Sequence, residues 1–107
     1  MPLVNIEYDD KQISDEEATQ LSQAVQKIVS EATQIKDVFV YGNSSRIKVE
    51  IAPIEIFIQM SDHKINDIDE LTKLIVTNIG NWKLKTNFKH LINLTVIPMK
   101  WKIEIGI

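Results

Sequence analysis

The sequence predicts an α+β protein with a two-layer, duplicated βαβ fold, in which two helices cover one face of a four- to six-stranded mixed sheet. Two segments with helical periodicity each lie between segments that alternate as strands do. Each half of the chain begins its first strand at a proline, Pro2 or Pro53. With 107 residues and 44% hydrophobic side chains, the chain can bury one core. We therefore expect a single domain over residues 1–107, with pseudo-repeat halves of about 1–52 and 53–107.

In the first half, a strand leads into a helix with a well-marked start. Val4, Ile6 and Tyr8 share one face at a spacing of two, which is typical of a strand. Ser14 and Glu17 have the spacing of a capping box, in which each side chain satisfies a free backbone amide at a helix start. The predicted elements are a strand at 2–8, a helix at 15–34, and strands at 37–41 and 46–51 on either side of a turn at 42–45.

The second half repeats this order. Asn66 or Asp67 can cap its helix, and Gly80 stands where a helix often ends with a left-handed residue. Pro98 is expected to stop the return strand. The predicted elements are a strand at 54–59, a helix ending near Gly80, a lysine- and asparagine-rich loop at 81–90, and strands at 91–97 and 101–107.

Composition narrows the class of partner. The net charge of −3 argues against a general nucleic-acid binder, which is normally basic. Without cysteine the chain has no disulfide, thiolate metal site or cysteine nucleophile. No apolar run is long enough for a membrane span, and the first residues lack the pattern of a signal peptide. We therefore expect a cytoplasmic protein with no nucleic-acid and no membrane partner.

The predicted layers leave one face of the sheet without cover. Two helices cover one face only, and we expect the other face to carry many of the isoleucines. An apolar face of this kind is normally buried against another surface. The strand at 101–107 follows a proline break and is suited to pairing with the sheet edge of a neighbour. These features predict an oligomer.

Four stretches of the chain resemble the tautomerase superfamily, which includes 4-oxalocrotonate tautomerase, 5-carboxymethyl-2-hydroxymuconate isomerase and macrophage migration inhibitory factor. The likeness spans nearly the whole chain and is greatest to a bacterial branch of unassigned function. The resemblance implies a homotrimer with its sheets facing inward and its helices outside. The stretches are Met1-Pro2-Leu3-Val4, Asp37-Val38-Phe39, Ile54-Glu55-Ile56-Phe57 and Val96-Ile97-Pro98-Met99.

The resemblance also implies that Pro2 is the catalytic residue of a tautomerase or isomerase. Removal of Met1 would leave a secondary amine, and an apolar pocket or a nearby cation would lower its pKa. A neutral amine can take a proton from the carbon next to a carbonyl and return it elsewhere. The expected substrate is a small 2-oxo acid or enol, and the chemistry needs no cofactor and no metal. The alternative interpretation is that Pro2 merely begins a strand.

A cation must hold the substrate carboxylate and stabilise the enolate. The resemblance implies a lysine or arginine near the end of the first helix, and Lys36 has that position. Arg46 is the only arginine, and Lys48 shares its face by alternation. The scarcity of arginine departs from the relatives that grip carboxylates with several arginines, which argues against a dicarboxylate substrate. The structural alternative is that Lys36 and Arg46 are solvated surface residues.

Two other functional classes remain open at this stage. One is a catalytically inactive, tautomerase-fold oligomeric binding module, and the other is a ferredoxin-like ligand-binding domain, which has the same element order. His63 and His90 are interpreted as surface residues. Trp82, Phe88 and Trp101 interleave with lysines, and we interpret them as loop anchors rather than a site for single-stranded nucleic acid.

Overall fold

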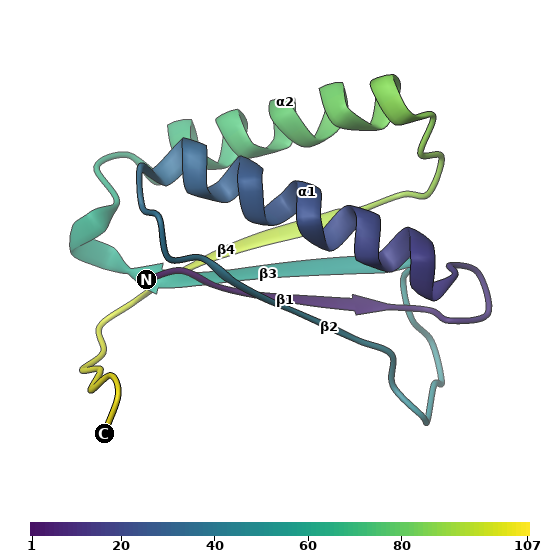
Figure 1. The fold of residues 1–107 in the computed structure, drawn as a ribbon, viewed down its shortest axis with the longest axis horizontal. Helices are drawn as coiled ribbons and strands as arrows, with labels where there is room; N and C mark the ends of the chain where they lie inside the picture. The colour runs from purple at the N-terminus through teal and green to yellow at the C-terminus, as the bar shows by residue number, and fades with distance from the viewer.

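A computed structural model describes residues 1–107, with four strands in one sheet and two long helices (Figure 1). Neither helix is long and apolar enough to cross a membrane. The elements in chain order are β1 (Leu3–Tyr8), α1 (Asp15–Thr33), β2 (Phe39–Asn43), β3 (Ile54–Ser61), the short 3-10 helix η1 (Asp62–Lys64), α2 (Ile68–Thr86) and β4 (Asn93–Met99).

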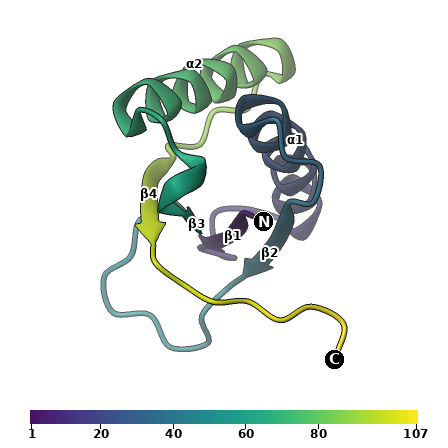
Figure 2. The same cartoon turned by 90° about the vertical axis from the view of Figure 1, so that its left-hand side faces the viewer.

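The strand order β2-β1-β3-β4 confirms the predicted fold class, with four strands. β1 and β2 are parallel, β3 and β4 are parallel, and the central pair β1 and β3 is antiparallel. Each half is therefore a βαβ unit whose two strands are direct neighbours. Figure 2 shows both helices on the same side of the curved sheet. A ferredoxin-like sheet splits its βαβ units, so this topology excludes that alternative.

The core lies between the sheet and the two helices. Alternate residues of the central strands point toward the helices, which is why Val4, Ile6, Ile54, Ile56 and Ile58 are 0% exposed. They pack against the apolar stripe that each helix presents at a spacing of three or four residues. The helix residues in this cluster are Ala18, Leu21, Val25, Val29, Ile75 and Ile79.

Both helix starts are as predicted. The Ser14 hydroxyl accepts a hydrogen bond from the Glu17 amide, and the Glu17 carboxylate accepts one from the Ser14 amide, which completes the capping box. Asp67, rather than Asn66, caps α2 by accepting from the amides of Asp69 and Glu70.

The predicted end of the second helix at Gly80 is wrong, and so is the loop predicted to follow it, because α2 continues to Thr86. Asn87 adopts the left-handed conformation, with φ 59°. The Phe88 amide then donates to the Lys83 carbonyl at 3.0 Å, and the Phe88 ring packs on Trp82 with centroids 5.0 Å apart. This hydrogen bond and apolar contact define a Schellman motif, which ends the helix at Thr86, six residues beyond Gly80.

The predicted strands at 46–51 and 101–107 are not strands in this chain. Both segments alternate apolar and polar residues, but a strand needs a neighbouring ladder of backbone groups as well as alternation. Neither segment pairs with the outer edge of β2 or of β4. Their apolar side chains are consequently exposed, as Val49 at 97% shows.

The uncovered face of the sheet also differs from the prediction. The isoleucines of β1 and β3 point toward the helices, because they occupy the alternate positions of those strands. The register places mixed rows on the open face. One row is Phe39, Leu3, Gln59 and Ile97, and the next is Tyr41, Asn5, Phe57 and Thr95. Phe39 and Tyr41 are 46% and 54% exposed, so the open face is aromatic and polar rather than rich in isoleucine.

Candidate active site

Pro2 lies immediately before β1 in an apolar setting. Its side chain is less than 2% exposed, and its carbonyl accepts a hydrogen bond of 3.2 Å from the Phe39 amide. The ladder pairs Leu3 with Phe39 on one side and with Gln59 on the other. One residue earlier, Pro2 is thus in register with Val38 and Met60, which are 6% and 1% exposed. The pyrrolidine ring is therefore shielded by buried neighbours on both flanking strands.

Several chain segments meet at the Pro2 end of the sheet. β3 runs antiparallel to β1, so the ends of β3 and β4 lie here, together with η1 and the segment that enters β2 (Figure 1). Lys36 belongs to that entering segment, three residues before Phe39, and its side chain is exposed. The structure therefore brings Pro2 and Lys36 to the same end of the molecule.

Arg46 and Lys48 lie at the opposite end. They follow the last residue of β2, and Lys48 contacts Asp10, which comes just after β1. Six residues of extended strand separate Pro2 from Tyr8, which is about 20 Å. Within one chain, the structure does not bring Arg46 or Lys48 to Pro2.

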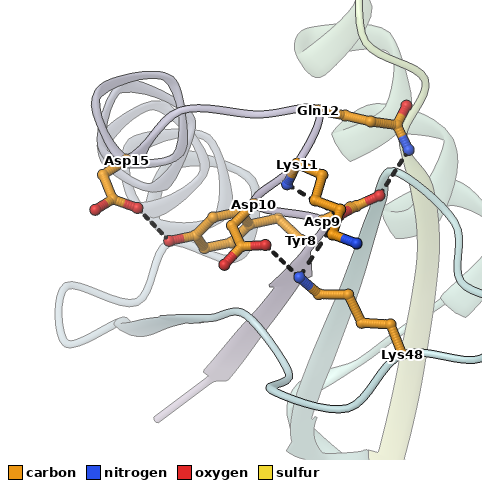
Figure 3. A network of polar contacts seen from close by, with 7 residues as sticks. All are labelled: Tyr8, Asp9, Asp10, Lys11, Gln12, Asp15 and Lys48. Atoms are coloured by element: carbon orange, nitrogen blue, oxygen red, sulfur yellow. Dashed lines mark hydrogen bonds and ion pairs between the residues drawn. The ribbon is translucent and has the colours of Figure 1, made fainter.

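Lys48 is instead part of a polar network (Figure 3). Its ammonium group pairs with the carboxylate of Asp10 and lies 3.6 Å from that of Asp9. The hydrogen bond with Asp10 raises the pKa of Lys48 and lowers the pKa of Asp10. Through these ion pairs, the exposed segment that follows β2 contacts the connection between β1 and α1. We interpret the network as a structural lock.

Other hydrogen bonds hold the carboxylates and the phenol of this network. Gln12 donates to Asp9 at 2.8 Å and the Lys11 amide donates at 3.0 Å, and these two bonds lower the pKa of Asp9. The Tyr8 hydroxyl donates to Asp15 at 2.9 Å, which raises the pKa of the phenol (Figure 3). Both shifts favour the protonation states that the groups already have at neutral pH, so the network is not poised for proton transfer.

At the Pro2 end, the structure shows a second polar group, in which the exposed His63, predicted to be a surface residue, lies beside Ser61 and Asp62. Ser61 is the last residue of β3 and is buried, and its hydroxyl oxygen lies 3.0 Å from Nε2 and 3.3 Å from Nδ1 of His63. The Asp62 carboxylate lies 3.4 Å from His63 Nδ1. The sequence signal for this cluster is the run Ser61-Asp62-His63 at the end of a predicted strand. Because that strand, β3, is antiparallel to β1, its end lies beside the start of β1 and hence near Pro2.

No family model matches the sequence, and no curated protein is similar to it in sequence. Solved structures are similar in fold. A 5-carboxymethyl-2-hydroxymuconate delta-isomerase superposes with a TM-score of 0.68 at 10% identity, over 99% of this chain and 89% of that one. A malonate semialdehyde decarboxylase inhibited by 3-bromopropiolate has a TM-score of 0.68 at 16% identity, over 97% and 90%. A macrophage migration inhibitory factor-like protein from Entamoeba histolytica has a TM-score of 0.57 at 18% identity, over 96% and 95%.

These likenesses cover nearly the whole of each chain. They confirm, at the level of the fold, the resemblance to the tautomerase superfamily. The protein has a tautomerase-superfamily fold, with a buried proline at the start of its first strand.

Proposed function

We propose that the protein is a tautomerase or isomerase in which Pro2, after removal of Met1, moves a proton on a small 2-oxo acid or enol. The observation that supports this most is the burial of the Pro2 ring beside Val38 and Met60 at the end of β1. The similarity in fold to a muconate isomerase supports the same class of reaction.

The proposed chemistry follows from the state of one nitrogen. Apolar surroundings disfavour the charged ammonium form and so lower the pKa of an amine. The neutral imino nitrogen takes a proton from the carbon next to the substrate carbonyl, which leaves an enolate. The protonated nitrogen then returns the proton to another atom of the same substrate, so the reaction is a balanced isomerisation that uses no cofactor. A cation stabilises the enolate oxygen, and Lys36 is the proposed group on the β2 side of Pro2.

We also propose that the working form is a homotrimer in which the open faces of the sheets are covered. Exposed Phe39 and Tyr41 on that face are suited to burial against another copy. Arg46 and Lys48 lie at the other end of the sheet, so a role at Pro2 would require a neighbouring subunit. Two aspartates engage Lys48, which leaves Arg46 as the better candidate for such a contact.

Intact mass and activity together test the proposal. We expect the purified protein to have lost Met1 and to convert phenylenolpyruvate to its keto form. The variant Pro2→Ala should lose about 100-fold or more of this rate, which is the usual contribution of a general base. Pro98→Ala, at an exposed position of β4, is the matched control and should keep the rate.

A second variant separates the nitrogen from the ring. One extra residue between Met1 and Pro2 keeps the proline side chain but converts its nitrogen to an amide, so this variant should be as inactive as Pro2→Ala. Equal rates for the unaltered protein and both variants would contradict the proposal and leave a non-catalytic binding module. The acetylenic acid 3-bromopropiolate, which inhibits the decarboxylase of similar fold, provides an independent probe. It should label the protein with a free Pro2 and not the extended variant.

A further inference from the structure

A hollow opens between η1 and the segment that follows β4. Asp62, His63, Lys100, Trp101 and Lys102 line it, and its volume is about 420 Å³. The chain makes this hollow from two short stretches, because Ser61 and Met99 are neighbours in the ladder between β3 and β4. The residues directly after each strand therefore face each other across the end of the sheet.

The charges in the hollow are predominantly positive. Two lysines and a histidine line it against a single carboxylate, that of Asp62. Neither Lys100 nor Lys102 forms an ion pair with an acidic side chain, whereas Lys48 at the other end of the sheet pairs with two. The Asp62 carboxylate lies 3.4 Å from His63 Nδ1, so its nearest basic neighbour is the histidine. The two lysines thus remain available to an anion.

His63 is directed by a buried partner. Its side chain is 76% exposed, but the Ser61 hydroxyl, at the buried end of β3, lies 3.0 Å from Nε2. A contact of this kind restrains an otherwise mobile surface ring. Trp101 contributes an aromatic wall on the opposite stretch. The hollow therefore combines two unpaired cations with an aromatic surface, which are components of a site for a small organic anion.

The hollow is also near the proposed reaction centre. β1, β3 and β4 are consecutive neighbours in the sheet, and strands lie about 4.8 Å apart. Pro2 is in register with Met60, and the hollow begins one residue beyond the ends of β3 and β4. This places the nearest backbone of the hollow, at Asp62 and Lys100, roughly 8–12 Å from Pro2 on the β4 side. Figures 1 and 2 both show η1 and the start of the C-terminal segment at this end of the sheet.

We propose that this hollow binds the carboxylate of the small 2-oxo acid on which Pro2 acts, with Lys100 and Lys102 as the contacts to the carboxylate. The assignment rests on the proposed function for the identity of the substrate, but the binding of a carboxylate does not require turnover. Charge-assisted hydrogen bonds from two lysines supply the affinity, and Trp101 packs against the non-polar part of the ligand.

Tryptophan fluorescence tests the binding directly. The chain has two tryptophans, so the variant Trp82→Phe leaves Trp101 as the only reporter. Titration with pyruvate should give a saturable change, and pyruvamide, which keeps the ketone but lacks the charge, should give none. The double variant Lys100→Gln/Lys102→Gln should weaken pyruvate binding by about tenfold or more. The control Lys85→Gln/Lys89→Gln removes two exposed lysines elsewhere on the surface and should leave binding unchanged.

The other outcomes of this titration overturn the proposal. A response to pyruvate that does not saturate, or that survives the loss of both lysines, removes the hollow as the site. An equal response to pyruvamide shows that the charge is not recognised. Tighter binding of inorganic phosphate than of pyruvate assigns the hollow to a different anion.

Kinetics separate this assignment from the function of Pro2. If Pro2 is the catalytic base, the double lysine variant should raise KM by about tenfold while kcat changes far less, because the lysines bind substrate and transition state alike. Saturable binding without turnover would retain the hollow and reject the proposed reaction. Turnover that depends on Pro2 but not on the two lysines would retain the reaction and reject the hollow.

Discussion

Glu17 is bonded to His90 across the fold, with His90 Nε2 lying 2.8 Å from Glu17 Oε2. The other carboxylate oxygen of Glu17 accepts from the Ser14 amide at 3.0 Å, so the residue that caps α1 also holds the connection between α2 and β4. Lys83 secures the same connection by donating to the His90 carbonyl at 2.6 Å. One carboxylate therefore couples the start of the first helix to the chain beyond the end of the second.

This coupling predicts a pH dependence of stability. The hydrogen bond from the Ser14 amide, followed by that from His90, lowers the pKa of Glu17. A lowered pKa in the folded state means that the ionised carboxylate stabilises the fold above its ordinary pKa of about 4.3 and that this contribution is lost as the pH falls further. Denaturation between pH 3 and pH 7 should show a shallower acid decline for Glu17→Gln than for the unaltered protein. Glu16→Gln, at the exposed neighbouring position, should keep the original slope; equal slopes for all three proteins would contradict this account.

The lock around Lys48 predicts a local change in mobility. Replacing Lys48 with methionine keeps most of the side-chain volume but removes the pairing with Asp9 and Asp10. Amide hydrogen exchange of residues 44–52 should then accelerate by up to about fivefold, the range expected for a partly exposed ion pair. Arg46→Met, at an exposed position with no ion pair, should leave exchange unchanged. Identical exchange in both variants would show that the segment is held by something else.

The same lock should weaken at both extremes of pH. The pKa of Asp10 is lowered, so its contribution fades as the pH falls below about 4. The pKa of Lys48 is raised, so the contribution of the ammonium group is present below about 10.4 and is lost as the pH rises above that value. Between these limits, exchange of residues 44–52, corrected for the intrinsic rate, should be independent of pH.

Gly80 offers a test of the corrected helix boundary. It lies inside α2, and a Cβ atom added there would meet nothing within 4 Å. Gly80→Ala should therefore raise the free energy of unfolding by about 1 kcal/mol, the difference in helix propensity. Chemical denaturation measures the change. A destabilised Gly80→Ala protein would indicate that the helix ends at this glycine, as the sequence alone predicts.

Two adjacent residues of β3 test the proposed oligomer. Phe57 points to the open face, whereas Ile56 is fully buried beneath the helices. Phe57→Lys should leave the fold intact by circular dichroism and shift the sedimentation coefficient to that of a monomer. Ile56→Lys should unfold the chain, because it buries an unpaired charge. A Phe57→Lys protein with unchanged mass in solution would contradict burial of the open face between copies.

The fold could be predicted from the sequence wherever local signals and packing agree. The start of α1 is set locally by the capping box at Ser14. The strand β3 is likewise indicated by the alternation of Ile54, Ile56 and Ile58 with more exposed residues. The Gly80 error arose because a glycine permits a left-handed residue without requiring one. The actual end depends on Asn87 and on contact between Phe88 and Trp82, which only the folded helix brings together.

The candidate site was predictable only in part. Pro2 and Lys36 follow from the predicted order of elements, because both precede parallel neighbouring strands. The positions of Arg46 and Lys48 could not be deduced, since alternation at 46–51 does not reveal whether a partner strand exists. His63 lies on the surface as predicted, but its neighbours could not be deduced, because the sequence does not show that the end of β3 meets the residues that follow β4.

An NMR titration of the Pro2 nitrogen, in protein labelled with 15N-proline and freed of Met1, tests directly whether Pro2 can act as a base. We expect the pKa of this nitrogen to lie below about 8, the ordinary value of a free α-amino group, because the buried residues of the flanking strands surround the Pro2 ring. A pKa at or above that ordinary value, or a protein that retains Met1 in its native cell, would contradict this role of Pro2.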